Sequence, residues 1–76
     1  MKVLINGNAY EMGRKTFIGV LDIAKKSVPF GIYAVRKGDF CEMKKDIFRT
    51  QAEMNKQIAE YQRQGFQVYF NGKSKA

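Results

Sequence analysis

Polar and apolar residues follow two different periods along the chain, and each period predicts a different kind of element. Short segments rich in β-branched and aromatic residues predict strands at 2–5, 8–12, 30–37, 40–45 and 66–70. Two longer segments, 16–27 and 51–64, carry apolar residues three or four positions apart, as amphipathic helices do. The order β-β-α-β-β-α-β predicts a single α+β domain over residues 1–72, in which two helices pack on one mixed sheet.

The strongest local signal is the Asn6-Gly7 pair between the first two predicted strands. A two-residue type I′ turn needs a positive φ at both central positions, which Asn and Gly tolerate best. This turn would pair Ile5 with Asn8, Val3 with Tyr10 and Lys2 with Glu11. The last pair sets opposite charges across from each other, which favours this register.

The first helix is expected from about Thr16, as N-cap, to Ser27, where Val28-Pro29 ends it. Gly19 lies inside this helix and costs about 1 kcal/mol relative to alanine, which we interpret as a sign of close packing against a strand. A strand over Thr16–Val20 is the alternative.

The second helix carries a fuller set of boundary signals. Thr50 and Glu53 form a capping box, and Gly65 stands where a left-handed residue would end a helix that runs to about Gln64. One side of this helix is apolar and is expected to pack on the sheet: Met54, Ile58 and Tyr61.

The predicted order of elements resembles a β-grasp (ubiquitin-like) sheet with a second helix inserted before the last strand. The resemblance is topological and no sequence motif carries it. The chain lacks the terminal diglycine of the ubiquitin-like modifiers and sulfur carriers, so conjugation chemistry is not implied. Residues 73–76 form a basic tail that we expect to be disordered.

Composition narrows the range of functions. Fourteen lysines and arginines against seven acidic residues give a net charge of +7, and there is no histidine and only one cysteine, Cys41. A cationic surface attracts a polyanionic or acidic partner, whereas the missing histidine argues against an enzyme.

We expect Cys41 to be buried and inert, with no metal and no cofactor bound. A lone thiol without a signal peptide or membrane span indicates the cytoplasm.

The charge is concentrated in residues 25–49, which hold seven basic and three acidic side chains. A hairpin around Gly38-Asp39 would pair Lys37 with Phe40, Val35 with Glu42 and Tyr33 with Lys44, and would place these six side chains on one face of the sheet. Such a mixture of rings and cations is typical of faces that stack bases and contact phosphates.

We therefore predict a small non-enzymatic module that binds nucleic acid, DNA or RNA, through this hairpin. The predicted binding residues are Tyr33, Arg36, Lys37, Phe40, Lys44, Lys45 and Arg49. One alternative is a protein-interaction adaptor that offers a sheet edge or the aromatic face to an acidic protein. A second, structural alternative is an outer sheet face whose lysine stems simply cover aromatic rings.

Overall fold

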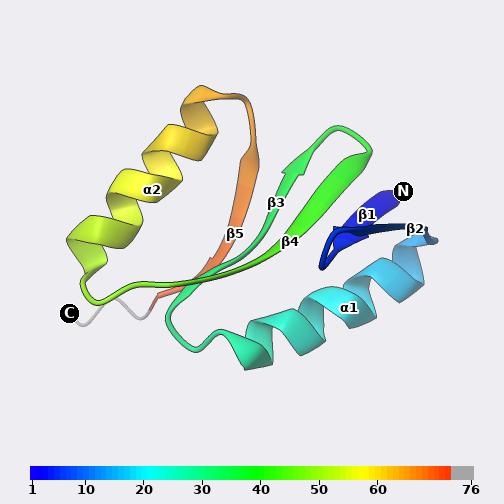
Figure 1. Ribbon diagram of the computed structural model, residues 1–76, viewed down its shortest axis with the longest axis horizontal. Helices are drawn as coiled ribbons and strands as arrows, with labels where there is room; N and C mark the ends of the chain where they lie inside the picture. Colours follow the sequence, from blue (N-terminus) through cyan, green and yellow to red (C-terminus); the bar gives the residue numbers. More distant parts are fainter. Residues whose placement is uncertain (73–76) are drawn as a thin grey trace.

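The computed structural model describes residues 1–72 as one mixed sheet of five strands with a helix on each face (Figure 1). The elements follow the chain as β1 (Lys2–Ile5), β2 (Asn8–Glu11), α1 (Arg14–Ser27), β3 (Gly31–Lys37), β4 (Phe40–Ile47), α2 (Gln51–Arg63) and β5 (Gln67–Asn71). The strands lie in the order β2-β1-β4-β3-β5. This confirms the predicted α+β class and element order. The predicted basic tail, residues 73–76, lies outside the described residues.

The first hairpin forms as its turn residues predict. Asn6 and Gly7 have φ angles of 51° and 84°, the positive values that a type I′ turn requires. The register pairs Lys2 with Glu11 and Ile5 with Asn8. The predicted register of β1 and β2 is therefore confirmed.

The two hairpins are joined at the centre of the sheet by parallel pairing of β1 with β4. Within the second hairpin, Lys37 pairs with Phe40 and Val35 with Glu42, as predicted. The register then shifts between Ile32 and Ala34, where β4 holds two residues opposite one residue of β3. The predicted pairing of Tyr33 with Lys44 is wrong, because this β-bulge changes which side chains share a face.

The N-cap of α1 lies three residues earlier than predicted. This residue is Gly13, and no side chain caps the first turn of the helix, so Thr16 is not the cap. The helix ends at Ser27, as predicted, and the strand alternative for Thr16–Val20 is wrong. A Cβ on Gly19 would meet no atom within 4 Å, so close packing inside the chain does not account for this glycine.

The C-terminal end of α2 matches its sequence signal, and the N-terminal end shows one of the two hydrogen bonds of the predicted capping box. The Thr50 hydroxyl accepts a hydrogen bond from the Glu53 amide at 3.2 Å. At the other end, the Gly65 amide donates to the Gln62 carbonyl and the Phe66 amide to the Tyr61 carbonyl, each at 3.0 Å. These two bonds, with Gly65 at a φ of 93°, form a Schellman motif. The accompanying apolar contact joins the Tyr61 and Phe66 rings, whose centroids lie 6.0 Å apart.

Each face of the sheet has its own hydrophobic core, and β3 contributes to both. The core under α1 contains Val3, Phe17, Val28, Tyr33, Ala34 and Cys41. The core under α2 contains Ile32, Val35, Met54 and Ile58. The end of β5 is attached to the α1 side by the Asn71 amide, which donates to the carbonyls of Lys25 and Val28 at 2.8 and 3.0 Å.

Candidate functional site

Helix α2 packs on β3 and β5 and leaves the rest of its face of the sheet without a helix. Because side chains alternate along each strand, the pairing register fixes which residues point to this side. We call this surface the open face; it is formed by β1, β2 and β4, with Lys37 of β3 at its border. Its residues are Lys2, Leu4, Ala9, Glu11, Lys37, Phe40, Glu42 and Lys44.

A row of cation, ring and cation crosses the open face at one end of the sheet. Phe40 in β4 pairs with Lys2 of β1 on one side and with Lys37 of β3 on the other. The Phe40 ring is half-buried, and both lysines are exposed. Neighbouring strands lie about 4.8 Å apart, so a base stacked on Phe40 would have an ammonium within reach on either side.

Lys37 is held in place by the end of α2. Its Nζ donates to the Gln64 carbonyl at 3.1 Å and lies 5.5 Å from the centre of the Phe66 ring. A cation at a helix C-terminus complements the negative end of the helix dipole. Since an ammonium has three N–H donors and Lys37 is exposed, this bond leaves donors for a phosphate.

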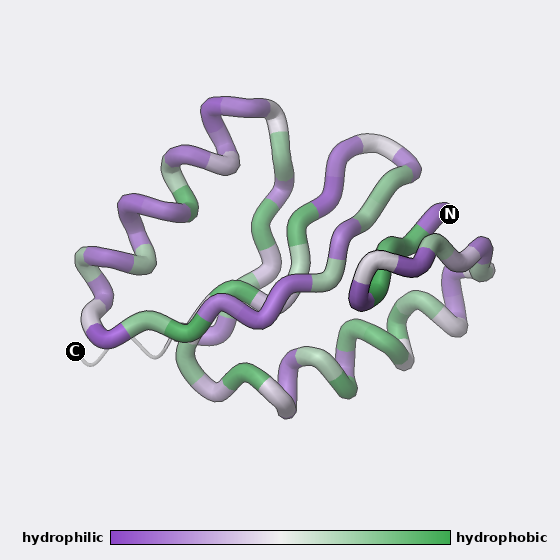
Figure 2. The backbone as a smooth tube through the Cα atoms, viewed as in Figure 1, coloured by the Kyte–Doolittle hydropathy of each residue, from purple (hydrophilic) through white to green (hydrophobic). Residues whose placement is uncertain are grey.

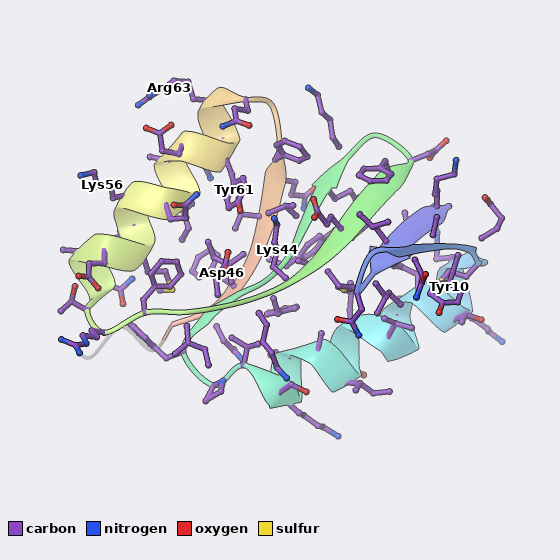
Figure 3. All side chains as sticks on the ribbon, viewed as in Figure 1. Tyr10, Lys44, Asp46, Lys56, Tyr61 and Arg63 are labelled. Atoms are coloured by element: carbon purple, nitrogen blue, oxygen red, sulfur yellow. The ribbon has the colours of Figure 1, made fainter. Side chains whose placement is uncertain are left out.

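Lys44 lies at the border between the open face and α2, and its side chain points from β4 toward Tyr61 (Figure 3). Its Nζ lies 5.6 Å from the centre of the Tyr61 ring and 3.5 Å from the Glu42 carboxylate. Burial alone would lower the pKa of Lys44, but the interactions with the Tyr61 hydroxyl and with Glu42 raise it above the ordinary value. Lys44 therefore stays charged at neutral pH.

The open face brings together three of the seven predicted binding residues: Lys37, Phe40 and Lys44. Tyr33 is not among them, because the bulge turns its ring into the core under α1, where it is 9% exposed. The expectation that Tyr33 and Phe40 share an exposed face is wrong, so the predicted stacking surface of two rings does not form. Phe40 is the one ring of the predicted pair that remains on the open face. Burial and the neighbouring Tyr69 also raise the pKa of Tyr33.

The remaining predicted residues lie elsewhere on the surface. Arg36 is on the α1 side of β3, and its Nε donates to the Gly38 carbonyl at 2.9 Å in the hairpin turn. Lys45 is also on the α1 side, at the edge of a groove beside that helix. Arg49 is exposed in the connection between β4 and α2. These three cations do not join the row through Phe40.

Lys2 and Leu4 belong to the open face but were missed by the sequence analysis. Both reach it because β1 pairs in parallel with β4. Parallel partners lie far apart in the sequence and are joined by no turn, so no local signal gives their register. The only available hint was the predicted pairing of Lys2 with Glu11, which set the orientation of Lys2 relative to β2.

The chemistry available near this surface is limited. Cys41 is fully buried, and burial raises the pKa of its thiol from 9.0 to about 11. The thiolate that a nucleophile needs is therefore disfavoured. Among residues 1–72, no three side chains of the metal-ligating types lie close enough to hold a metal ion.

Neither described helix combines the length and the apolar character that crossing a membrane requires. A comparison of the chain with protein-family models, curated proteins and solved structures finds no match. Any functional interpretation of the open face therefore rests on its own geometry and charge.

Proposed function

We propose that this protein is a non-enzymatic module, cytoplasmic in location, that binds single-stranded nucleic acid on the open face. The observation that carries the proposal is the row Lys2–Phe40–Lys37 on a part of the sheet that no helix covers. In this arrangement a base stacks on the Phe40 ring, and the two ammonium groups meet the phosphates that flank it. Lys44 adds a third cation further along β4.

The distribution of ion pairs supports a polyanionic ligand. Within residues 1–72, salt bridges join Glu42 to Lys44, Glu60 to Arg63 and Glu11 to the N-terminal amine. The remaining lysines and arginines of residues 1–72 have no carboxylate of these residues within 4 Å, and the whole chain carries a net charge of +7. Neutralising phosphates with such cations would supply most of the affinity.

The proposal predicts separate effects of the ring and of the cations. Replacing Phe40→Ala should weaken binding of a single-stranded oligonucleotide by about 1–3 kcal/mol and affect a duplex less, because only unpaired bases can stack. Replacing Lys2→Gln should weaken binding to all sequences and reduce the slope of log K against log salt by about 0.7. Fluorescence anisotropy over a series of salt concentrations measures both quantities.

Two further variants sharpen the test. Replacing Glu42→Gln removes a carboxylate from the open face and frees Lys44, so it should strengthen binding. Lys15→Gln is the matched control for Lys2→Gln, because Lys15 is exposed on α1, away from the open face. It should leave the affinity and the salt slope nearly unchanged. Equal affinity for polyglutamate and for the oligonucleotide, with no loss in Phe40→Ala, would reject the proposal in favour of an acidic protein partner.

A further inference from the structure

A groove lies on the opposite side of the sheet from the open face, between the C-terminal half of α1, the end of β1 and the middle of β4. It encloses about 360 Å³, which falls within the range of ligand pockets. Its lining is mainly aliphatic: Ile5, Val20, Ile23, Ala24, Val28 and Met43. We call it the α1 groove.

One large apolar side chain is exposed on the outer side of α1 next to this groove. Ile23 lines the groove and is 68% exposed. Figure 2 shows hydrophobic segments along much of α1, whereas α2 is mainly hydrophilic. Because single exposed apolar residues are common on proteins, Ile23 by itself would indicate little; the cavity beside it makes it the edge of a continuous apolar surface.

Gly19 provides an independent observation. It precedes Ile23 by four residues, so both lie on the same side of α1. A glycine inside a helix lowers stability by about 1 kcal/mol relative to alanine, yet a Cβ at Gly19 would meet nothing within 4 Å in this chain. Its absent side chain leaves a shallow place where a polypeptide backbone can approach the helix closely.

The lysines around the groove favour an acidic partner over a basic one. Lys44 and Lys45 line the groove. Lys26 lies outside the lining, one helical turn from Ile23, and Asp22 precedes Lys26 by four residues on the same side of α1. Among the described residues that line it, none is acidic. A second copy of this chain would carry the same net charge of +7 to the site and would be repelled. An acidic partner would be attracted, and its carboxylates would meet ammonium groups at the rim.

We propose that the α1 groove is a docking site for an acidic segment of another protein. The segment inserts an apolar side chain between α1 and Met43 of β4, passes its backbone over Gly19 and directs its carboxylates toward Lys26 and Lys45. The groove lies on the α1 side of the sheet and the open face on the α2 side, and Lys44 borders both. If both proposals hold, the protein binds a nucleic acid and an acidic protein on opposite sides of the sheet.

The test uses a synthetic helix-forming peptide with leucines along one side and glutamates along the other, and a matched peptide with lysines in place of the glutamates. The acidic peptide should bind the full chain and shift the NMR signals of Val20, Ile23 and Met43. Replacing Ile23→Glu should weaken binding roughly tenfold or more, because it removes an apolar side chain that the bound peptide would cover and adds a charge of the same sign as the peptide's. Gly19→Leu should also weaken binding, although leucine favours the helix.

Ile18→Glu is the matched control, since Ile18 is 53% exposed on α1 but lies outside the groove. It should change the affinity by no more than about twofold. Circular dichroism checks that the variants stay folded. Equal losses in Ile18→Glu and Ile23→Glu, equal binding of the lysine peptide, or no shift at Val20 and Met43 would each overturn the proposal. A dimer that Ile23→Glu abolishes would overturn it as well, by assigning the groove to a second copy. Oligonucleotide binding should be unchanged in Ile23→Glu, so this proposal and that for the open face can fail separately.

Discussion

At the scale of single residues, the side of the sheet that a side chain faces determines whether it is buried or available to a ligand. Cys41 and Phe40 are neighbours in β4, yet Cys41 is fully buried beneath α1 while Phe40 reaches the open face. The alternation of a strand therefore separates the one thiol of the chain from the candidate ligand-binding surface. Chemical modification of Cys41 reports on unfolding rather than on ligand binding.

The thiol should accordingly react only when the protein opens. Burial raises the pKa of Cys41 from 9.0 to about 11, so the unfolded chain releases this proton at a lower pH than the folded protein. The contribution of Cys41 to stability is therefore lost as the pH rises from 9.0 toward about 11. Labelling with a thiol reagent at pH near 8 should be slow and should accelerate in denaturant. Rapid labelling of the folded protein would contradict the burial.

Cys41→Ser should reduce stability by about 1–3 kcal/mol, because it places a hydroxyl among apolar side chains. Chemical denaturation followed by circular dichroism measures this change. The binding proposed for the open face should be the same in the folded variant, since Cys41 does not reach that face.

At the scale of elements, α2 depends on local signals at its ends and on the sheet beneath its apolar side. Thr50→Ala removes the hydroxyl that accepts from the Glu53 amide and should cost about 1 kcal/mol of unfolding free energy.

Ile58→Ala removes a buried side chain from the core under α2 and should cost about 2–5 kcal/mol of unfolding free energy. Urea titrations measure both values, and Ala59→Ser on the exposed side of α2 is a control with little expected change.

Elements marked by local chemistry were predictable from the sequence. Asn6-Gly7 fixed the first hairpin, and Thr50 with Gly65 bounded α2. The start of α1 was not predictable in this way, because Gly13 caps it without a side chain. The β-bulge beside Tyr33 and the parallel pairing of Lys2 with Phe40 depend on contacts between distant segments. Because of the bulge, Tyr33 lies outside the candidate site, and because of the parallel pairing, Lys2 lies within it.

At the scale of the whole molecule, the sheet separates two surfaces of different character. The α2 side carries the open face, with its aromatic ring between lysines, and the α1 side carries an aliphatic groove with lysines at its rim. Lysines occur on both sides, so the net charge of +7 does not distinguish the two surfaces. What distinguishes them is the arrangement of apolar groups: a ring on a flat sheet suits a base, and a groove beside a helix suits an apolar side chain.

The sharing of β3 between two cores has a consequence for motion. Residues 31–35 are buried on both faces, whereas α2 and β5 are attached to the rest of the molecule mainly through β3 and the Asn71 side chain. If α2 and β5 detach, the core under α1 keeps four hydrogen-bonded strands and its own helix. The chain should therefore contain two cooperative units, with the unit of residues 48–72 opening first.

Native-state hydrogen exchange in low denaturant measures this hierarchy. Amides of α2 and β5 should exchange together at a lower opening free energy than the paired amides of β1, β3 and β4, and Asn71→Ala should widen the gap. Identical opening free energies throughout the chain would mean that the molecule unfolds as one unit. Because the open face borders α2 through Lys44 and Tyr61, each such opening would also release these two side chains from one another. A ligand that holds Lys37 and Lys44 together would then slow hydrogen exchange in a helix that it does not touch.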